Sequence, residues 1–188
     1  MDKAPYDPRA IANLILKVRG LTGLRTTHLE LQKLLYFCHG YYLSRFNEPL
    51  IEGHFEAWKD GPVHPYIYNC FRHYKANPIE SFAMVHDYRT GEIRAVEQIG
   101  NKHVRRIVGS IVVQLRHLTA SELRQKSHVA NGPWHSVWES AKINLASSIR
   151  IPDDAIIRRY FRHLVSEPVD GDDLDAYEDQ PPESIRGR

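Results

Sequence analysis

Residues 27–74 decide the fold, and they read THLELQKLLYFCHGYYLSRFNEPLIEGHFEAWKDGPVHPYIYNCFRHY. Thr27 and Glu30 have the spacing of a capping box, in which each side chain accepts a hydrogen bond from the other residue's backbone N–H, so a helix should start there. From that start to about Phe46, apolar residues recur at three- and four-residue steps and also fill much of the opposite face. We therefore predict a helix that is apolar nearly all round and lies at the centre of the core.

The second half of the same stretch predicts a strand, a tight turn and another helix. Residues 54–58 can form a short strand, and residues 59–62 (Lys-Asp-Gly-Pro) form a strong turn signal. In such a turn glycine supplies a positive φ and proline presets the next φ. Pro65 has the position of a proline in the first turn of a helix, which we expect to run to about Lys75.

Working outward, the chain predicts further helices and one β-hairpin. The hairpin is expected from Arg89-Thr90-Gly91 between two short strand-like segments, 84–88 and 93–96. Asp7-Pro8 and the capping box at Thr119 and Glu122 mark two more helix starts. The predicted helices cover about residues 7–19, 101–118, 119–127, 133 onward and 152–165. The expected fold class is mainly α: a single compact helical domain with a short β-hairpin or a small antiparallel sheet.

Charge is distributed unevenly along the chain, whose formal net charge is +2. Residues 166–188 contain eight acidic residues and two arginines, which leaves residues 1–165 at about +8. The acidic segment also has three prolines and few large apolar groups, a composition typical of disorder. We expect a domain at residues 1–165 and an acidic, flexible tail at residues 166–188.

The apolar runs, such as residues 111–113, are too short to cross a membrane. The first residues lack the basic and apolar regions of a secretory signal peptide. We therefore expect a cytoplasmic protein with no membrane partner.

Residue patterns for catalysis are weak. The sequence contains no Gly-rich phosphate loop, no Gly-x-Ser-x-Gly elbow and no His-Glu-x-x-His pair. Glu56, Asp60 and His64 are brought together by the predicted turn and could act as an acid and a base, but no nucleophile or orienting group accompanies them. We expect no enzymatic activity.

Cysteines and histidines on two neighbouring predicted helices suggest a metal site. Cys38 and His39 lie on the central helix, and Cys70 and His73 lie one helical turn apart on the next. Tetrahedral zinc could use such groups, but the spacing is not that of a usual closed motif, and Cys38 falls in the apolar stripe. We expect these cysteines to pack as small hydrophobes, with no metal and no cofactor.

Two segments together carry a family resemblance. They are residues 31–43 (LQKLLYFCHGYYL) and, after Pro49-Leu50, residues 55–68 (FEAWKDGPVHPYIY). They resemble the Panacea domain of SocA-like antitoxins, and residues 7–18 and the Gly-Pro-Trp at 132–134 are similar to its first helix and its late Pro-Trp element. The resemblance covers about residues 7–165. Cys38 departs from the small residue common at its position, and His64 lies inside the Gly-Pro-Val-x-Pro turn.

The resemblance implies a helical domain that neutralises a cognate toxin by direct binding. In the SocA type it also implies a proteolytic adaptor, which hands the toxin to the ClpXP protease. The residues expected to bind the toxin, or to form the family motif, are Trp58, Lys59, Asp60, Gly61, Pro62, Val63, His64, Pro65, Tyr68 and Trp134. Two structural readings stay open beside this one: the turn can be a rigid support for the fold, and each tryptophan can be a buried anchor.

The alternative function is a nucleic-acid-binding regulator of the protein's own operon. Arginines that could contact phosphates recur in two predicted helices, at Arg105, Arg106, Arg116, Arg158, Arg159 and Arg162. No recognisable recognition helix accompanies them, so nucleic acid is not the favoured partner.

Overall fold

The computed structural model of this chain describes residues 3–144 and 149–154. In these ranges the chain is mainly α-helical with two small antiparallel sheets, as the sequence predicts. The helices are α1 (Pro8–Leu21), α2 (His28–Phe46), α3 (Pro65–Phe71), the short 3-10 helix η1 (Arg72–Tyr74), α4 (Lys102–Gln114), α5 (Ala120–Ser127) and α6 (Pro133–Asn144). The strands are β1 (Phe55–Trp58), β2 (Gly61–Val63), β3 (Met84–His86), β4 (Ile93–Ala95) and β5 (Arg150–Ile151).

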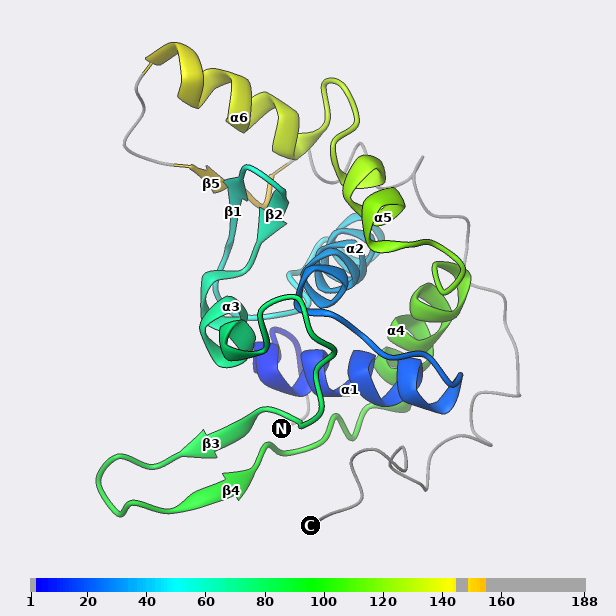
Figure 1. Cartoon of the computed structure of the whole chain (residues 1–188), viewed down its shortest axis with the longest axis vertical. Helices are drawn as coiled ribbons and strands as arrows, with labels where there is room; N and C mark the ends of the chain where they lie inside the picture. Colours follow the sequence, from blue (N-terminus) through cyan, green and yellow to red (C-terminus); the bar gives the residue numbers. More distant parts are fainter. Residues whose placement is uncertain (1–2, 145–148, 155–188) are drawn as a thin grey trace.

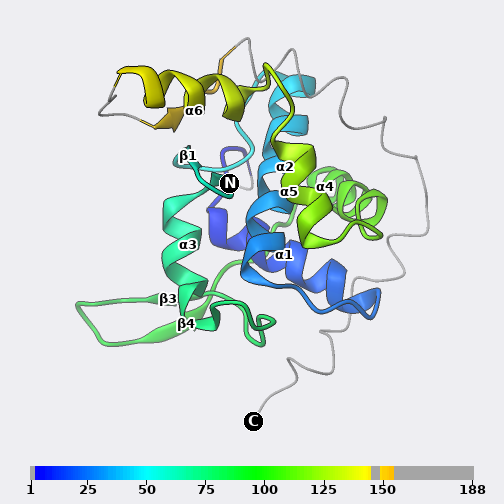
Figure 2. The same ribbon diagram turned by 45° about the horizontal axis from the view of Figure 1, so that its top comes forward.

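Helix α2 runs through the middle of the molecule, with α1, α3, α4 and α5 around it (Figures 1 and 2). The predicted capping box starts the helix: the Glu30 carboxylate accepts from the Thr27 N–H at 2.8 Å, and the Thr27 hydroxyl accepts from the Glu30 N–H at 3.4 Å. Every residue from 31 to 43 is buried. The predicted central position of this helix is therefore confirmed.

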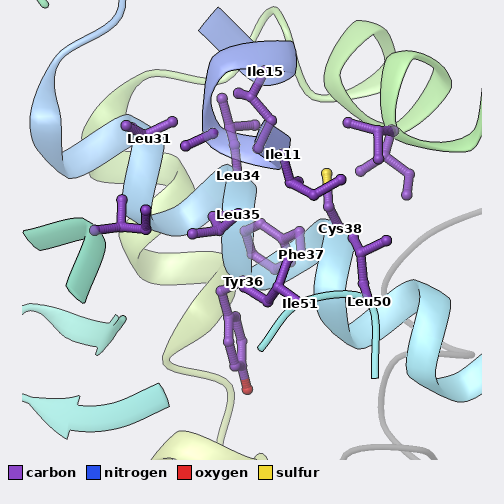
Figure 3. Close-up of a cluster of buried hydrophobic side chains, with 14 of the residues drawn as sticks. Ile11, Ile15, Leu31, Leu34, Leu35, Tyr36, Phe37, Cys38, Leu50 and Ile51 are labelled. Carbon is purple, nitrogen blue, oxygen red and sulfur yellow. The ribbon is translucent and has the colours of Figure 1, made fainter. Parts of the chain in front are cut away.

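Helix α1 covers one side of α2 with its apolar stripe. In Figure 3, Ile11 and Ile15 from α1 lie against Leu34 and Cys38 from α2. Each fully buried aliphatic side chain in such a cluster contributes about 2 kcal/mol. Cys38 is 0% exposed, and burial raises the pKa of its thiol, so its predicted packing role is confirmed.

A buried ion pair joins α1 to α2 beneath these contacts. Arg19, 3% exposed, donates to the second carboxylate oxygen of Glu30 at 2.9 Å. It also donates to the Arg116 carbonyl oxygen after α4, at 3.3 Å. One arginine thus connects α1, α2 and the turn after α4, and it uses the same glutamate that caps α2.

The three-stranded sheet has the order β2-β1-β5, and all neighbours are antiparallel. Strand β1 was predicted, whereas β2 and β5 were not. The register pairs Trp58 with Gly61, which leaves Lys59 and Asp60 as a two-residue turn. The turn lies at one end of the molecule, beneath α6 (Figure 1).

Strands β3 and β4 form the predicted hairpin, which projects from the body as a separate ribbon (Figure 1). The Asn13 side chain in α1 holds its base, since it donates to the Ala83 carbonyl at 3.0 Å and accepts from the Ala83 N–H at 2.8 Å. The base of the ribbon is therefore fixed to the helical body.

The third helix differs from what the sequence predicts, and the predicted C-terminal segments lie mostly beyond the described residues. The helix predicted from Pro65 to about Lys75 is wrong in length, because α3 ends at Phe71, η1 follows, and Lys75 turns the chain with φ +53°. Most of the helix predicted at 152–165, and the acidic segment 166–188, lie outside the described residues. Among the described residues, no helix is both long and apolar enough to cross a membrane.

Candidate functional site

The turn between β1 and β2 depends on a glycine in the left-handed region. Gly61 has φ +102°, as the sequence predicts for this position. A Cβ on this residue would lie 2.8 Å from Lys33 Nζ, 2.8 Å from Ser127 Oγ and 2.9 Å from His128 Nε2. Gly61 is therefore required for its backbone conformation and also for the close approach of three polar side chains.

Side chains of α2 take the place of a neighbouring strand at the outer edge of β2. The Lys33 ammonium donates to the Pro62 carbonyl oxygen at 2.9 Å, and the Gln32 amide oxygen accepts from the His64 N–H at 2.8 Å. Buried backbone groups need such partners, because an unpaired one costs about 1–3 kcal/mol. The central helix thus fixes the strand that carries the turn.

Lys33 itself is 0% exposed. Burial lowers the pKa of its ammonium to about 7; the nearby Asp60 carboxylate partly offsets this effect, and Arg124 adds to it. A buried cation is expensive unless it is paired or hydrogen-bonded. The sequence does not mark Lys33 as a site residue, since a lysine on a helix is normally solvated.

Trp134 in α6 and His128 after α5 also support the turn. The Trp134 indole N–H donates to the Trp58 carbonyl oxygen at 2.9 Å, and its ring stacks on His128 with centroids 3.6 Å apart. Burial lowers the pKa of His128 to about 4, with the charges of Arg124 and Lys33 acting in the same direction. His128 is therefore neutral at pH 7.

His64 lies between β2 and α3 and is the N-cap residue of α3. Its Nδ1 accepts from the Ile67 N–H at 3.5 Å, so the imidazole caps the helix, while Nε2 lies 2.9 Å from the Glu52 carbonyl oxygen. Together these contacts indicate the neutral tautomer with the proton on Nε2. Burial lowers the pKa of His64, which agrees with that state.

Glu56, Asp60 and His64, the candidate acid–base set, have separate structural partners. Glu56 accepts from the Trp58 indole N–H at 2.7 Å, and Asp60 pairs with Arg124 Nε at 3.1 Å. His64 is occupied by the capping contacts above. Their observed bonds support the turn instead of converging on a reacting centre.

Of the ten predicted site residues, five are buried and five are at least partly exposed. Gly61, Pro62, Val63, His64 and Trp134 are buried and serve as structural support. Trp58, Pro65 and Tyr68 are partly exposed, and Lys59 and Asp60 are exposed. The Trp58 and Tyr68 rings lie 4.7 Å apart, so an aromatic pair stands beside a charged turn.

The metal hypothesis has no geometric support within residues 3–144 and 149–154. No group of three or more His, Cys, Asp or Glu side chains there is placed to hold a metal ion. His39 instead lies with Nε2 3.2 Å from the Asp153 carboxylate. Cys38, on the same helix, faces the apolar core.

The arginines named for nucleic-acid binding are only partly described. Arg105 and Arg106 lie on α4 and Arg116 follows it, while residues 158, 159 and 162 lie outside the described ranges. Arg105 donates to the carbonyl oxygens of Ile99 and Gly100, at 2.8 and 3.0 Å. At least one of these cations is thus used to hold the chain entering α4.

Comparison with known proteins assigns the chain to a family. Residues 31–135 match the family model described as "Antitoxin SocA-like, Panacea domain". Over 181 residues, which cover 96% of each chain, the sequence is 34% identical to "Antitoxin SocA" of Caulobacter vibrioides (strain NA1000 / CB15N). The chain belongs to the SocA-like antitoxin family. No solved structure gives a significant match.

In this SocA-like antitoxin, the matched range runs from α2 into α6. It contains the two residues that hold the backbone on either side of the turn, Lys33 and Trp134. The resemblance expected from residues 31–43 and 55–68 is thereby confirmed. The role of this protein is that of an antitoxin in a toxin–antitoxin system. Membership in an antitoxin family favours a non-enzymatic role.

Proposed function

We propose that this SocA-like antitoxin neutralises its cognate toxin by direct protein–protein binding in the cytoplasm. The observation that carries the proposal is the arrangement at the β1–β2 turn, where Lys59 and Asp60 are exposed beside the Trp58–Tyr68 ring pair. Aromatic residues are enriched among binding hot spots, particularly when neighbouring groups exclude water from them. We name this surface, formed by Trp58, Lys59, Asp60 and Tyr68, the turn surface.

The turn surface is held rigidly from beneath, which favours binding. The Lys33 contact to Pro62 and the Trp134 contact to Trp58 fix the backbone on both sides of the turn. A surface ordered before binding loses less conformational entropy when a partner docks. The buried site residues therefore contribute to binding through the geometry that they impose.

Direct binding is tested by co-purification with the toxin from the neighbouring reading frame. Each protein is expressed from an unrelated promoter with an unrelated leader, so that repression of the native message cannot rescue growth. We expect rescue together with a stable complex. Rescue without a complex contradicts direct neutralisation.

We further propose that the bound toxin is delivered to ClpXP, as the resemblance to the SocA type implies. The test is a reconstituted reaction with purified toxin, ClpXP and ATP, with and without this protein. We expect the full chain to shorten the toxin half-life at least several-fold. If the half-life is unchanged while the complex still forms, the protein is a plain inhibitor and not an adaptor.

A further inference from the structure

The β3–β4 ribbon presents a mainly apolar face to solvent. The pairs Met84–Ala95 and His86–Ile93 place these four side chains on the same face. Met84 is 39% exposed and Ile93 is 61% exposed, while Tyr88 at the tip is 97% exposed. An isolated two-stranded ribbon is only marginally stable in water, so further strands would stabilise this one.

Among residues 3–144 and 149–154, no strand pairs with the backbone groups at the outer edge of β4. The Asp87 N–H donates to the Glu92 carbonyl oxygen at 2.9 Å, which makes 87–92 a hydrogen-bonded pair. Bonded and non-bonded pairs alternate in an antiparallel ladder, so the pair 86–93 is non-bonded. The N–H and C=O of Ile93 therefore point away from β3, toward the outer edge of β4.

The two edges of the ribbon differ in access. At the edge of β3, Arg9 Nη1 donates to the Met84 carbonyl oxygen at 3.4 Å. The Asn13 side chain is hydrogen-bonded to both the N–H and the carbonyl oxygen of Ala83. Within the described ranges, β4 has no sheet neighbour except β3. Its outer edge lies on the side away from the helical body (Figure 1).

The sequence Glu92-Ile93-Arg94 is complementary to itself in an antiparallel arrangement. If a two-fold axis passes beside Ile93, the two Ile93 residues face each other, and Glu92 of each copy faces Arg94 of the other. Both charged side chains are exposed. A strand of this charge pattern therefore fits a second copy of itself.

We propose that two copies of this chain associate through antiparallel β4 strands, which forms a four-stranded sheet in the order β3-β4-β4-β3. The two Ile93 residues exchange N–H···O bonds and extend the apolar face. Reciprocal Glu92–Arg94 pairs lie on the other face and fix the register. The interface is small, so the association depends on protein concentration.

The test measures the molar mass of the full chain by sedimentation across about 1 μM to 1 mM, where small interfaces dissociate. Glu92→Arg and Arg94→Glu each place like charges opposite one another, and we expect each to weaken self-association about tenfold or more. An equimolar mixture of the two variants restores opposite charges at both positions and should associate like the wild type. Glu48→Arg, an exposed residue after α2, is the matched control and should behave as the wild type.

A fourth variant tests the backbone contact. Ile93→Pro removes an N–H that β3 does not use, and edge strands accept proline at such positions. We expect this variant to stay monomeric with an unchanged melting temperature. The proposal is overturned if the wild type is monomeric throughout the range, or if the mixed charge variants fail to associate. It is also overturned if the charge variants lose toxin binding while the wild type remains a monomer, because the face would then belong to the toxin.

Discussion

The charge state of Lys33 differs strongly from that of an ordinary lysine. Its pKa falls from 10.5 in the unfolded chain to about 7 in the folded protein because it is buried. Between these pH values the unfolded chain binds a proton that the folded protein has released. The free energy of unfolding therefore rises with pH across this window, and the cost of the buried cation is fully present below pH 7.

We predict that this dependence disappears in Lys33→Met. The difference in unfolding free energy, wild type minus variant, should grow in favour of the wild type from pH 7 to 9.5, by a few kcal/mol. Urea titrations of both proteins at each pH measure it, and other titrating groups cancel in the difference. A difference that stays flat over this range would show that Lys33 keeps an ordinary pKa.

Gly61 and Gly91 provide a matched pair for the role of close packing. Both have positive φ, +102° and +76°, but only a Cβ at Gly61 would meet other atoms within 4 Å. We predict that Gly61→Ala lowers the free energy of unfolding by about 3 kcal/mol, from strain and from overpacking. Gly91→Ala should cost about 1 kcal/mol, from strain alone. If urea titrations show that both variants lose the same free energy of unfolding, close packing of Gly61 against Lys33 does not add to the cost of the substitution.

At the residue scale, the sequence predicted backbone requirements better than side-chain partners. Gly61 could be predicted because a Lys-Asp-Gly-Pro turn needs a positive φ within the turn itself. Lys33, Ser127 and His128 could not, because they meet Gly61 only after α2 and α5 pack against β2. The sole signal was a lysine on a helix that is otherwise apolar nearly all round.

At the scale of single elements, the two capping boxes differ in burial. Thr27 and Glu30 are partly buried, and Glu30 also binds the buried Arg19, whereas Thr119 and Glu122 are exposed. We predict that Thr27→Ala lowers the free energy of unfolding by about 2 kcal/mol and Thr119→Ala by about 1 kcal/mol. Chemical denaturation of both variants measures these losses. A larger loss of unfolding free energy for Thr119→Ala would contradict the role assigned to the Arg19–Glu30 ion pair between α1 and α2.

The elements that escaped prediction are β2 and β5. Strand β2 contains a proline and is buried throughout, so it lacks the alternation that marks a strand. Strand β5 has two residues and pairs with β1 across a long sequence separation. Their existence depends on tertiary pairing with β1, whereas the helices carry local start signals such as Thr27 and Asp7.

For the whole molecule, the division at residue 165 stays a prediction. Residues 166–188 carry a net charge of −6, and exposed ion pairs with a basic body are worth less than about 1 kcal/mol each. We predict that truncation after Val165 leaves the melting temperature and toxin binding unchanged but lengthens the toxin half-life in the ClpXP reaction. Loss of toxin binding on truncation would place the acidic segment in the interface.

The central claim is that the toxin binds at the turn surface, and calorimetric titration of the purified toxin into the full chain tests it most directly. The informative comparison is Trp58→Ala with Lys59→Glu against Lys102→Glu, which makes the same charge change at an exposed position on α4. Removing an aromatic hot spot costs about 2 kcal/mol or more. We therefore predict at least about thirtyfold weaker binding for the turn-surface variant and wild-type affinity for the Lys102→Glu control. Wild-type affinity in the turn-surface variant, with its melting temperature unchanged, would contradict the claim.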